Sequence, residues 1–150
     1  MRKDKLLFGI WSVFKAAILT CKKKFCESNK ILITNYSLIR ENCEWDIGNK
    51  LLELQNILEI GDYDWFEFKT ENLRKKLSKT TSSAGYRLKL ILRLFNTLMK
   101  TNFDYHLTVK IEKENLDQLK NPNKCFWDPI GFEMINTNDW IYAKALKLQN

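Results

Sequence analysis

The sequence predicts a mostly helical α+β protein built from two small lobes. Only five glycines and two prolines occur in 150 residues, so few positions interrupt long helices. Hydrophobic residues make up 45% of the chain and aromatic residues 13%, which is enough apolar material for a folded core. Residues 104–112 and 125–135 alternate polar and apolar side chains in part, as β-strands with one buried face do.

The first expected helix covers residues 6–21. Its apolar side chains recur at three- and four-residue spacing and form one stripe, which we expect to face the core. The basic segment 1–5 and the apolar run also resemble a signal peptide, but Lys15 interrupts the run, which is shorter than the ~20 residues of a membrane span. A core helix is therefore favoured over a cleaved signal or a membrane-surface helix. The stripe consists of Leu7, Ile10, Trp11, Phe14, Ile18, Cys21 and Phe25.

The first lobe, residues 1–68, has the element order of a winged helix-turn-helix, which is helix, strand, helix, helix and hairpin. Asp46 can cap the longer of the later helices, and the pair Gly61-Asp62 indicates the turn of the hairpin. The helix that would enter a DNA groove is acidic, so we expect this lobe to dock protein, including a contact in a homodimer. The expected elements are a strand at 30–34, helices at 35–41 and 47–58, and a hairpin that pairs 58–60 with 63–68.

The second lobe, residues 69–150, repeats this order in outline. The helix over 86–101 carries the strongest pattern, because an apolar face lies opposite a polar face whose residues recur at spacings of four, three and four. That polar face consists of Lys89, Arg93, Asn96 and Lys100. The expected elements are helices at 70–80, 86–101 and 139–148, strands at 104–112 and 125–135, and a wing-like loop at 112–124.

The charge of the chain is concentrated in one segment. Between Asn72 and Phe103 there are eight basic residues and no acidic one, so these 32 positions carry +8. The whole chain carries +7, and everything outside the segment sums to −1. A folded basic surface attracts a polyanion, because neutralising phosphates releases their counterions. We therefore expect the partner to be double-stranded DNA; the alternative is a solvated, solubilising helix face.

The residues of this segment divide into two expected roles. In a winged helix, the second helix of the pair reaches base edges, while the preceding helix and turn hold phosphates. Arginine suits guanine and asparagine suits adenine, because each forms two hydrogen bonds with that base. Arg87 lies on the apolar side by helical angle, but at the helix start it can turn outward. The residues expected to hold phosphates are Lys75, Lys76, Lys79, Ser82 and Ser83, with Lys113, Lys120 and Lys124 on the wing. Those expected to reach base edges are Arg87, Lys89, Arg93 and Asn96, and Arg74 and Lys100 complete the DNA-binding set.

Residues 66–135 resemble the DNA-binding winged-helix domain of plasmid replication initiator proteins. The resemblance rests on a long basic and apolar helix followed by a strand, RLKLILRLFNTLMKTNFDYHLTVKI, and on a second strand, IGFEMI. It implies a DNA-binding replication protein with an earlier winged helix used in dimer contacts, which residues 5–68 would supply. A phage replication organiser and a transcription regulator share the same element order.

No catalytic motif stands out in the sequence. His106 is the only histidine, the cysteine spacings fit no zinc motif, and no glycine-rich phosphate-binding loop occurs, so we expect no enzyme, no cofactor and no metal. Four cysteines at these spacings indicate reduced thiols, and hence a cytoplasmic protein. A nuclease that uses carboxylates gathered in space is the open alternative. Its carboxylates would be Asp62, Asp64, Asp128, Glu133 and Asp139.

A small protein-interaction module is the alternative from a different class. The acidic segment 31–71 and the aromatic residues Trp45, Trp65 and Trp127 can form a surface by which an inhibitor or adaptor docks on a larger partner. Salt separates the two alternatives, because phosphate contacts weaken steeply as salt rises whereas an apolar interface hardly changes. No apolar run reaches the length of a membrane span, so we expect no membrane partner.

Overall fold

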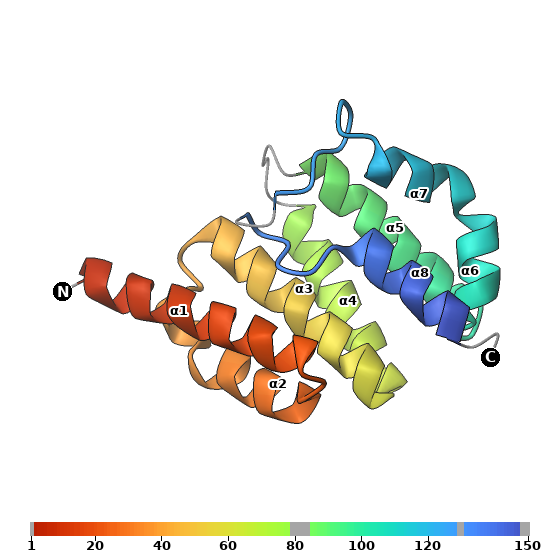
Figure 1. Ribbon diagram of the computed structural model, residues 1–150. Coiled ribbons are helices and arrows are strands. Elements are labelled where there is room, and N and C mark those ends of the chain that lie inside the picture. Colours follow the sequence, from red (N-terminus) through yellow and green to blue (C-terminus); the bar gives the residue numbers. More distant parts are fainter. Residues whose placement is uncertain (1, 79–84, 129–130, 148–150) are drawn as a thin grey trace. The chain divides into compact units, whose positions relative to one another are not determined.

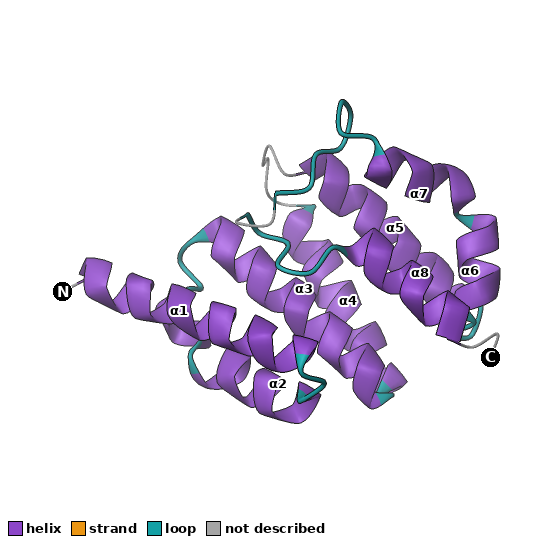
Figure 2. Cartoon of the chain, viewed as in Figure 1, coloured by secondary structure: helices purple, strands orange, loops and turns teal. Residues whose placement is uncertain are grey.

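The computed structural model describes residues 2–78, 85–128 and 131–147. Every regular element in these ranges is a helix (Figure 1). Figure 2 shows the same chain with loops and turns between the helices. The elements are α1 (Arg2–Cys21), α2 (Phe25–Thr34), the short 3-10 helix η1 (Tyr36–Leu38), α3 (Cys43–Ile60), α4 (Tyr63–Leu77), α5 (Gly85–Lys100), α6 (Tyr105–Ile111), α7 (Lys113–Lys120) and α8 (Thr137–Lys147).

The predicted α+β fold with two winged helix-turn-helix lobes is therefore wrong. The strands expected within the described residues are helical or irregular, so there is no sheet to carry a wing. The segment 30–34 lies in α2, 104–112 contains α6, the hairpin segments 58–60 and 63–68 lie in α3 and α4, the wing-like segment 112–124 contains α7, and 125–128 and 131–135 form no strand.

Several expected helices are confirmed. The segments 6–21, 86–101 and 139–148 correspond to α1, α5 and α8, with small differences at their ends. The helix expected at 47–58 begins earlier, because the side chain of Asn42 rather than Asp46 accepts the capping hydrogen bond, from the amide of Trp45 at 3.2 Å.

The pair Gly61-Asp62 does not form a hairpin turn, because it ends one helix and begins the next. Gly61 has a φ of 85°, and its amide donates hydrogen bonds to the carbonyls of Ile57 and Leu58, which closes α3. The Asp62 carboxylate accepts a hydrogen bond from the amide of Trp65 at 3.2 Å, which caps the first turn of α4. A glycine followed by an aspartate serves a helix–helix junction as well as a hairpin.

The segment 104–112 is helical for a similar local reason. The Asp104 carboxylate accepts a hydrogen bond from the amide of Leu107 at 2.8 Å and so caps α6. The buried residues then follow helical spacing, at Tyr105, Thr108 and Glu112, whereas Leu107 is exposed. The alternation in the sequence therefore does not mark the buried face of this segment.

The chain divides into two compact units. The first unit comprises residues 1–69 and 128–135, and the second comprises residues 70–127 and 136–150. The lobes expected from the sequence divide after residue 68, and the described residues of the two units contain none of the strands of a winged helix. Within the described ranges, no helix combines the length and the apolar character needed to cross a membrane.

In the first unit, α1 packs on α2 and α3 through its small side chains. Gly9, Ser12, Ala16 and Thr20 are all buried, at spacings of three and four residues along the helix. A Cβ atom on Gly9 would lie 2.6 Å from Cγ2 of Ile39, closer than Cβ atoms approach other atoms in proteins. The absence of a side chain at this position is what allows α1 to come so close.

A buried polar network fixes the same face of α1. The hydroxyl of Thr20 donates to Oδ1 of Asn56 in α3 at 2.7 Å, and the Asn56 amide donates to the hydroxyl of Ser28 in α2 at 2.8 Å. The Ser28 hydroxyl in turn donates to the carbonyl of Ala16 in α1 at 2.8 Å. Because each group would lose its partner if α1 rotated, the network holds three helices in one register.

The large apolar side chains of α1 consequently point outward. Leu7, Trp11 and Ile18, which the sequence placed on the core stripe, are 55%, 65% and 57% exposed. The expected orientation of this helix is therefore wrong. Periodicity marks the stripe of largest apolar side chains, but the close helix contact selects the small residues instead.

The second unit is built around α5. The side chains of Leu88, Ile91, Leu94, Phe95 and Leu98 are each at most 1% exposed. α5 packs on α6 and α7, and α8 also packs on α6 and α7. The burial of these side chains confirms the apolar face predicted for this helix. The prediction was possible because the five large side chains all lie on one side, so the helix has a single face to bury.

Gly48 in α3 offers a test of close packing within the first unit. A Cβ atom there would lie 2.4 Å from the carbonyl oxygen of Phe132, and a backbone oxygen cannot swing aside. We expect Gly48→Ala to lower the free energy of unfolding by about 1–3 kcal/mol, although alanine is the better helix former by about 1 kcal/mol. Gly85→Ala is the matched control, because a Cβ atom at Gly85 meets nothing within 4 Å. Urea unfolding of both variants measures the difference; equal stabilities would contradict the close contact.

Candidate nucleic-acid interface

The exposed side of α5 carries the polar face that the sequence predicted. Lys89, Arg93, Asn96 and Lys100 are all exposed, while the opposite side of the helix is buried. Their shared exposure is therefore confirmed. α5 contains no acidic residue, so nothing within the helix itself balances its charge. We call these four residues, together with Arg74 and Lys75 of α4, the basic face.

A hollow of about 500 Å³ lies between α4 and α5 in the second unit. It opens to solvent, and three of its lining side chains are cationic, which makes it a surface depression suited to an anion rather than an enclosed apolar pocket. One acidic side chain, Glu71, also lines it. The lining residues are Thr70, Glu71, Arg74, Lys89, Leu92, Arg93, Asn96 and Met99.

Arg93 is held in place by a carboxylate at the junction of α6 and α7. Its Nε lies 3.1 Å from Oε2 of Glu112, whose side chain is only 4% exposed, whereas the Arg93 side chain is 67% exposed. The hydroxyl of Thr97 donates a hydrogen bond to Oε1 of the same carboxylate at 2.6 Å. Glu112 therefore positions the guanidinium of Arg93 at the surface of α5. Sequence reasoning missed this contact because it placed Glu112 at the end of a strand.

Arg74 forms a second ion pair at the edge of the hollow. Its Nε and Nη2 each donate to a carboxylate oxygen of Glu71 at 2.9 Å, and Nζ of Lys75 lies 3.8 Å from the same carboxylate. The hydrogen bond from Arg74 lowers the pKa of Glu71, and the same contact raises the pKa of Arg74. One carboxylate thus faces two cations, which leaves the pair of helices with an excess of positive charge.

Lys89 and Lys100 differ from the two arginines, because neither forms an ion pair with a described residue. They are the residues of the basic face whose charge is least compensated. The surrounding unit is also basic, since residues 70–127 and 136–150 contain fourteen basic and six acidic residues. The first unit carries eleven basic and twelve acidic residues. The positive charge of the protein therefore belongs to the second unit.

Arg87 is not part of this surface. Its side chain is buried, and Nη1 donates hydrogen bonds to the carbonyls of Leu119 and Cys125 at 2.9 and 3.4 Å. Nη2 donates to Oδ1 of Asn138 at 3.1 Å. The expectation that Arg87 turns outward to reach DNA is therefore contradicted, because the guanidinium ties the end of α7, Cys125 and the first turn of α8 to α5.

The remaining predicted residues are distributed as follows. Lys79, Ser82 and Ser83 lie outside the residues that the structure describes. Lys76 is exposed near the end of α4. The three lysines expected on a wing are exposed as well, but Lys113 and Lys120 belong to the helix α7 and Lys124 follows it. Nζ of Lys120 lies 4.0 Å from the ring centroid of Tyr142.

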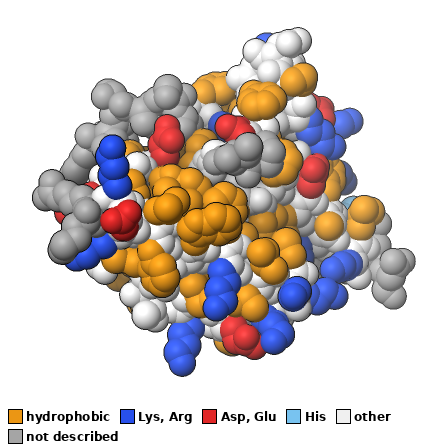
Figure 3. Space-filling model, turned by 60° about the vertical axis from the view of Figure 1, so that its left-hand side comes forward, with side chains coloured by type: hydrophobic (Ala, Val, Ile, Leu, Met, Phe, Trp, Pro, Cys, Tyr) orange, Lys and Arg blue, Asp and Glu red, His pale blue; other side chains and the backbone are white. Residues whose placement is uncertain are grey.

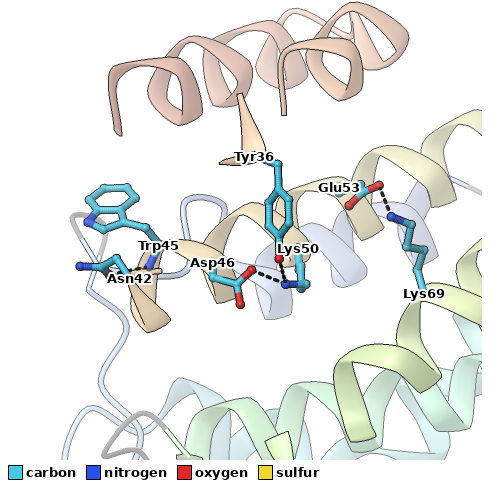
Figure 4. A network of polar contacts seen from close by, with 7 residues as sticks. All are labelled: Tyr36, Asn42, Trp45, Asp46, Lys50, Glu53 and Lys69. Atoms are coloured by element: carbon cyan, nitrogen blue, oxygen red, sulfur yellow. Dashed lines mark hydrogen bonds and ion pairs between the residues drawn. The ribbon is translucent and has the colours of Figure 1, made fainter. Parts of the chain in front are cut away.

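A second polar cluster lies in the first unit (Figure 4). Lys50 forms an ion pair with Asp46, which is fully buried, and donates a hydrogen bond to the hydroxyl of Tyr36 at 2.8 Å. Nζ of Lys69 lies 2.9 Å from Oε1 of the buried Glu53. Tyr36, Lys50, Glu53 and Lys69 line a hollow of about 180 Å³. Each lysine is balanced by a buried carboxylate, so we interpret the cluster as a structural link between η1, α3 and α4.

The other candidate groups are not brought together by the fold. Among the residues that the structure describes, no three His, Cys, Asp or Glu side chains form a cluster that could hold a metal ion. The carboxylate of Asp62 caps α4, and Glu133 is buried. All four cysteines are free thiols; Cys21, Cys26 and Cys43 are exposed and Cys125 is buried.

Comparison with protein-family models, with curated proteins and with solved structures gives no match for this chain.

The buried position of Arg87 predicts a structural role. We expect Arg87→Met to lower the free energy of unfolding by about 2–4 kcal/mol, because two carbonyls and an amide lose a charged donor inside the protein. Lys89→Met, two residues along the same helix but exposed, should change it by less than about 0.5 kcal/mol. Thermal and urea unfolding of the two variants test this difference. A stable Arg87→Met protein would show that the guanidinium is dispensable.

The ion pair of Lys50 allows a second test in the first unit. We expect Lys50→Met to cost about 3–5 kcal/mol, because it removes the cation beside the buried Asp46 carboxylate. The double variant Asp46→Asn/Lys50→Met should recover much of this loss, since no buried charge then remains at the pair. Urea midpoints of the two variants measure the recovery. A double variant as unstable as Lys50→Met would argue against the charge as the cause.

Proposed function

We propose that this protein binds double-stranded DNA through the basic face of α4 and α5. The observation that carries the proposal is the exposed, acid-free side of α5, which places Lys89, Arg93 and Lys100 in one row. In the second unit this row adjoins a hollow that is also lined by Arg74. Neutralisation of DNA phosphates by such a surface is the main source of affinity in sequence-independent binding.

The dimensions of α5 suit a groove of duplex DNA. From Lys89 to Lys100 the helix rises by about 16 Å, at about 1.5 Å per residue. The major groove is about 12 Å wide, so a helix that crosses it places its two ends near the phosphates of opposite strands. Lys89 and Lys100 stand at those ends. Arg93 and Asn96 lie between them, where arginine and asparagine side chains can reach guanine and adenine edges.

The proposed mode differs from that of a helix-turn-helix protein. Seven residues separate Leu77 at the end of α4 from Gly85 at the start of α5, whereas a helix-turn-helix motif joins its helices by a turn of three or four residues. The phosphate contacts are therefore assigned to the exposed cations Arg74, Lys75, Lys89 and Lys100. Arg93 contributes a charge that Glu112 partly balances. This arrangement supports binding mainly through contacts to the DNA phosphates, with contacts to base edges in addition.

We expect the affinity for a labelled duplex to fall steeply with salt. Four cations on phosphates give a slope of about −3 to −4 in log K against log salt, which is a loss of about 10²-fold between about 50 and 200 mM. Lys89→Glu/Lys100→Glu should weaken binding more than tenfold at low salt and reduce the slope by about two. These lysines are chosen because neither pairs with a described residue, whereas Arg93→Glu would also disturb Glu112.

The control for this experiment keeps the net charge equal. Lys110→Glu/Lys147→Glu changes two exposed lysines of the second unit that do not line the hollow. This variant should retain most of the affinity. Equal losses in the two double variants would show that only the total charge matters, and a duplex that fails to bind even at low salt would refute the proposal.

A further inference from the structure

A second surface, on α1, is apolar and open to solvent. Leu7, Phe8, Trp11 and Ile18 are between 55% and 65% exposed and lie on one side of the helix. Large apolar side chains gathered on a monomer surface mark a binding site more often than scattered ones do. Figure 3 shows one face of the protein on which hydrophobic side chains gather among lysine, arginine and acidic side chains. We call the four apolar residues, together with the exposed Lys15 among them, the α1 surface.

The outward direction of this surface is fixed by the packing of the first unit. The contact at Gly9 and the hydrogen bonds of Thr20 and Ser28 hold the small-residue side of α1 inward. The Trp11 ring also rests on Phe14, with centroids 6.0 Å apart, and Phe14 contacts Trp45 at 5.7 Å. The exposed indole of Trp11 therefore packs against Phe14, which in turn packs against Trp45. The α1 surface is a rigid feature of the folded unit, since turning it inward would break these contacts.

The surroundings of the α1 surface are basic. Lys15 lies within it, between Trp11 and Ile18 on the same side of the helix. Asp4 is the one acidic residue of α1. The exposed lysines on α1 and directly after it are Lys3, Lys5, Lys15, Lys22, Lys23 and Lys24. The partner of this surface therefore has to combine apolar material with negative charge.

A second copy of the chain does not meet this requirement. Two α1 surfaces face to face would enclose a Lys15 ammonium group from each copy, and like charges within an interface are unfavourable. The four side chains also expose only roughly 400–500 Å², about half of what each partner of a stable dimer buries. Protein interfaces in general exclude lysine from their centre. A lipid surface accepts such a lysine, because its stem lies along apolar groups while its ammonium reaches the headgroups.

We propose that α1 docks the first unit onto a membrane surface rich in anionic lipids. The helix would lie in the plane of the membrane, with Leu7, Phe8, Trp11 and Ile18 at the boundary between headgroups and acyl chains. The lysines along it would contact the lipid phosphates. This mode does not need a spanning segment, so it agrees with the absence of one among the described helices. The expectation of no membrane partner rested on the lack of a spanning run and on a first helix that packs in the core; the proposal takes up the alternative of a membrane-surface helix.

The experiment is co-sedimentation of the full chain with vesicles, one set of phosphatidylcholine alone and one of phosphatidylcholine with phosphatidylglycerol. We expect binding to the anionic set, and about tenfold or greater weakening in Phe8→Ser/Trp11→Ser, because two large apolar side chains no longer leave water. Phe126→Ser in the second unit is the matched control, since Phe126 is 70% exposed and lies outside α1. Its vesicle binding should be unchanged. Circular dichroism and urea unfolding establish that each variant is folded.

Two further arms separate the α1 surface from the basic face. Lys89→Glu/Lys100→Glu should still bind anionic vesicles, whereas loss of binding in this variant alone would show adsorption through α5 and overturn the proposal. The indole of Trp11 should shift its emission to shorter wavelength on binding, and Trp11→Phe should lose that shift. No sedimentation of the native chain with anionic vesicles would also overturn the proposal and turn attention to an acidic partner protein. None of these outcomes tests the proposed binding of duplex DNA, which is measured separately.

Discussion

The contact between the small side chains of α1 and the neighbouring helices determines which side of α1 is buried in the first unit and which side is exposed. A helix can bury its largest apolar side chains or approach its neighbours most closely, and here close approach wins. Gly9 leaves room for Ile39, and Thr20, Ser28 and Asn56 satisfy one another at the point where three helices meet. Each of these groups would be strained or unpaired if α1 rotated about its axis. What the unit presents to solvent follows from that choice.

The two units use their helices in different ways. α5 has five large apolar side chains on one side and cations on the other, so burial and exposure were both readable from the sequence. α1 is apolar nearly all round, and periodicity alone selected the wrong side. The difference lies in what competes for the interior. Where the large apolar side chains all lie on one face of a helix, the hydrophobic effect determines that this face is buried. Where two faces are apolar, close packing of the small residues determines which face is buried.

The strands expected from the sequence failed for a related reason. Short segments such as 104–112 fit both periods, and the capping carboxylate of Asp104 favoured the helix. The same applies to Gly61-Asp62, which is a good hairpin turn and an equally good junction of two helices. Of the candidate DNA contacts, the exposed row on α5 was predictable. The burial of Arg87 depends on Leu119 and Asn138, which are distant in sequence and gave no local signal.

The distribution of thiols has a practical consequence for studying the two surfaces. Cys21, Cys26 and Cys43 are exposed in the first unit, whereas Cys125 is buried in the second, with its sulfur 3.8 Å from Nη1 of Arg87. A maleimide reagent applied to the folded protein would therefore mark the first unit and leave the basic face untouched. Fluorophores or cross-linkers placed there would report the surroundings of α1 separately from any event at α5. The chain thus carries its own selective attachment points, with no engineered cysteine required.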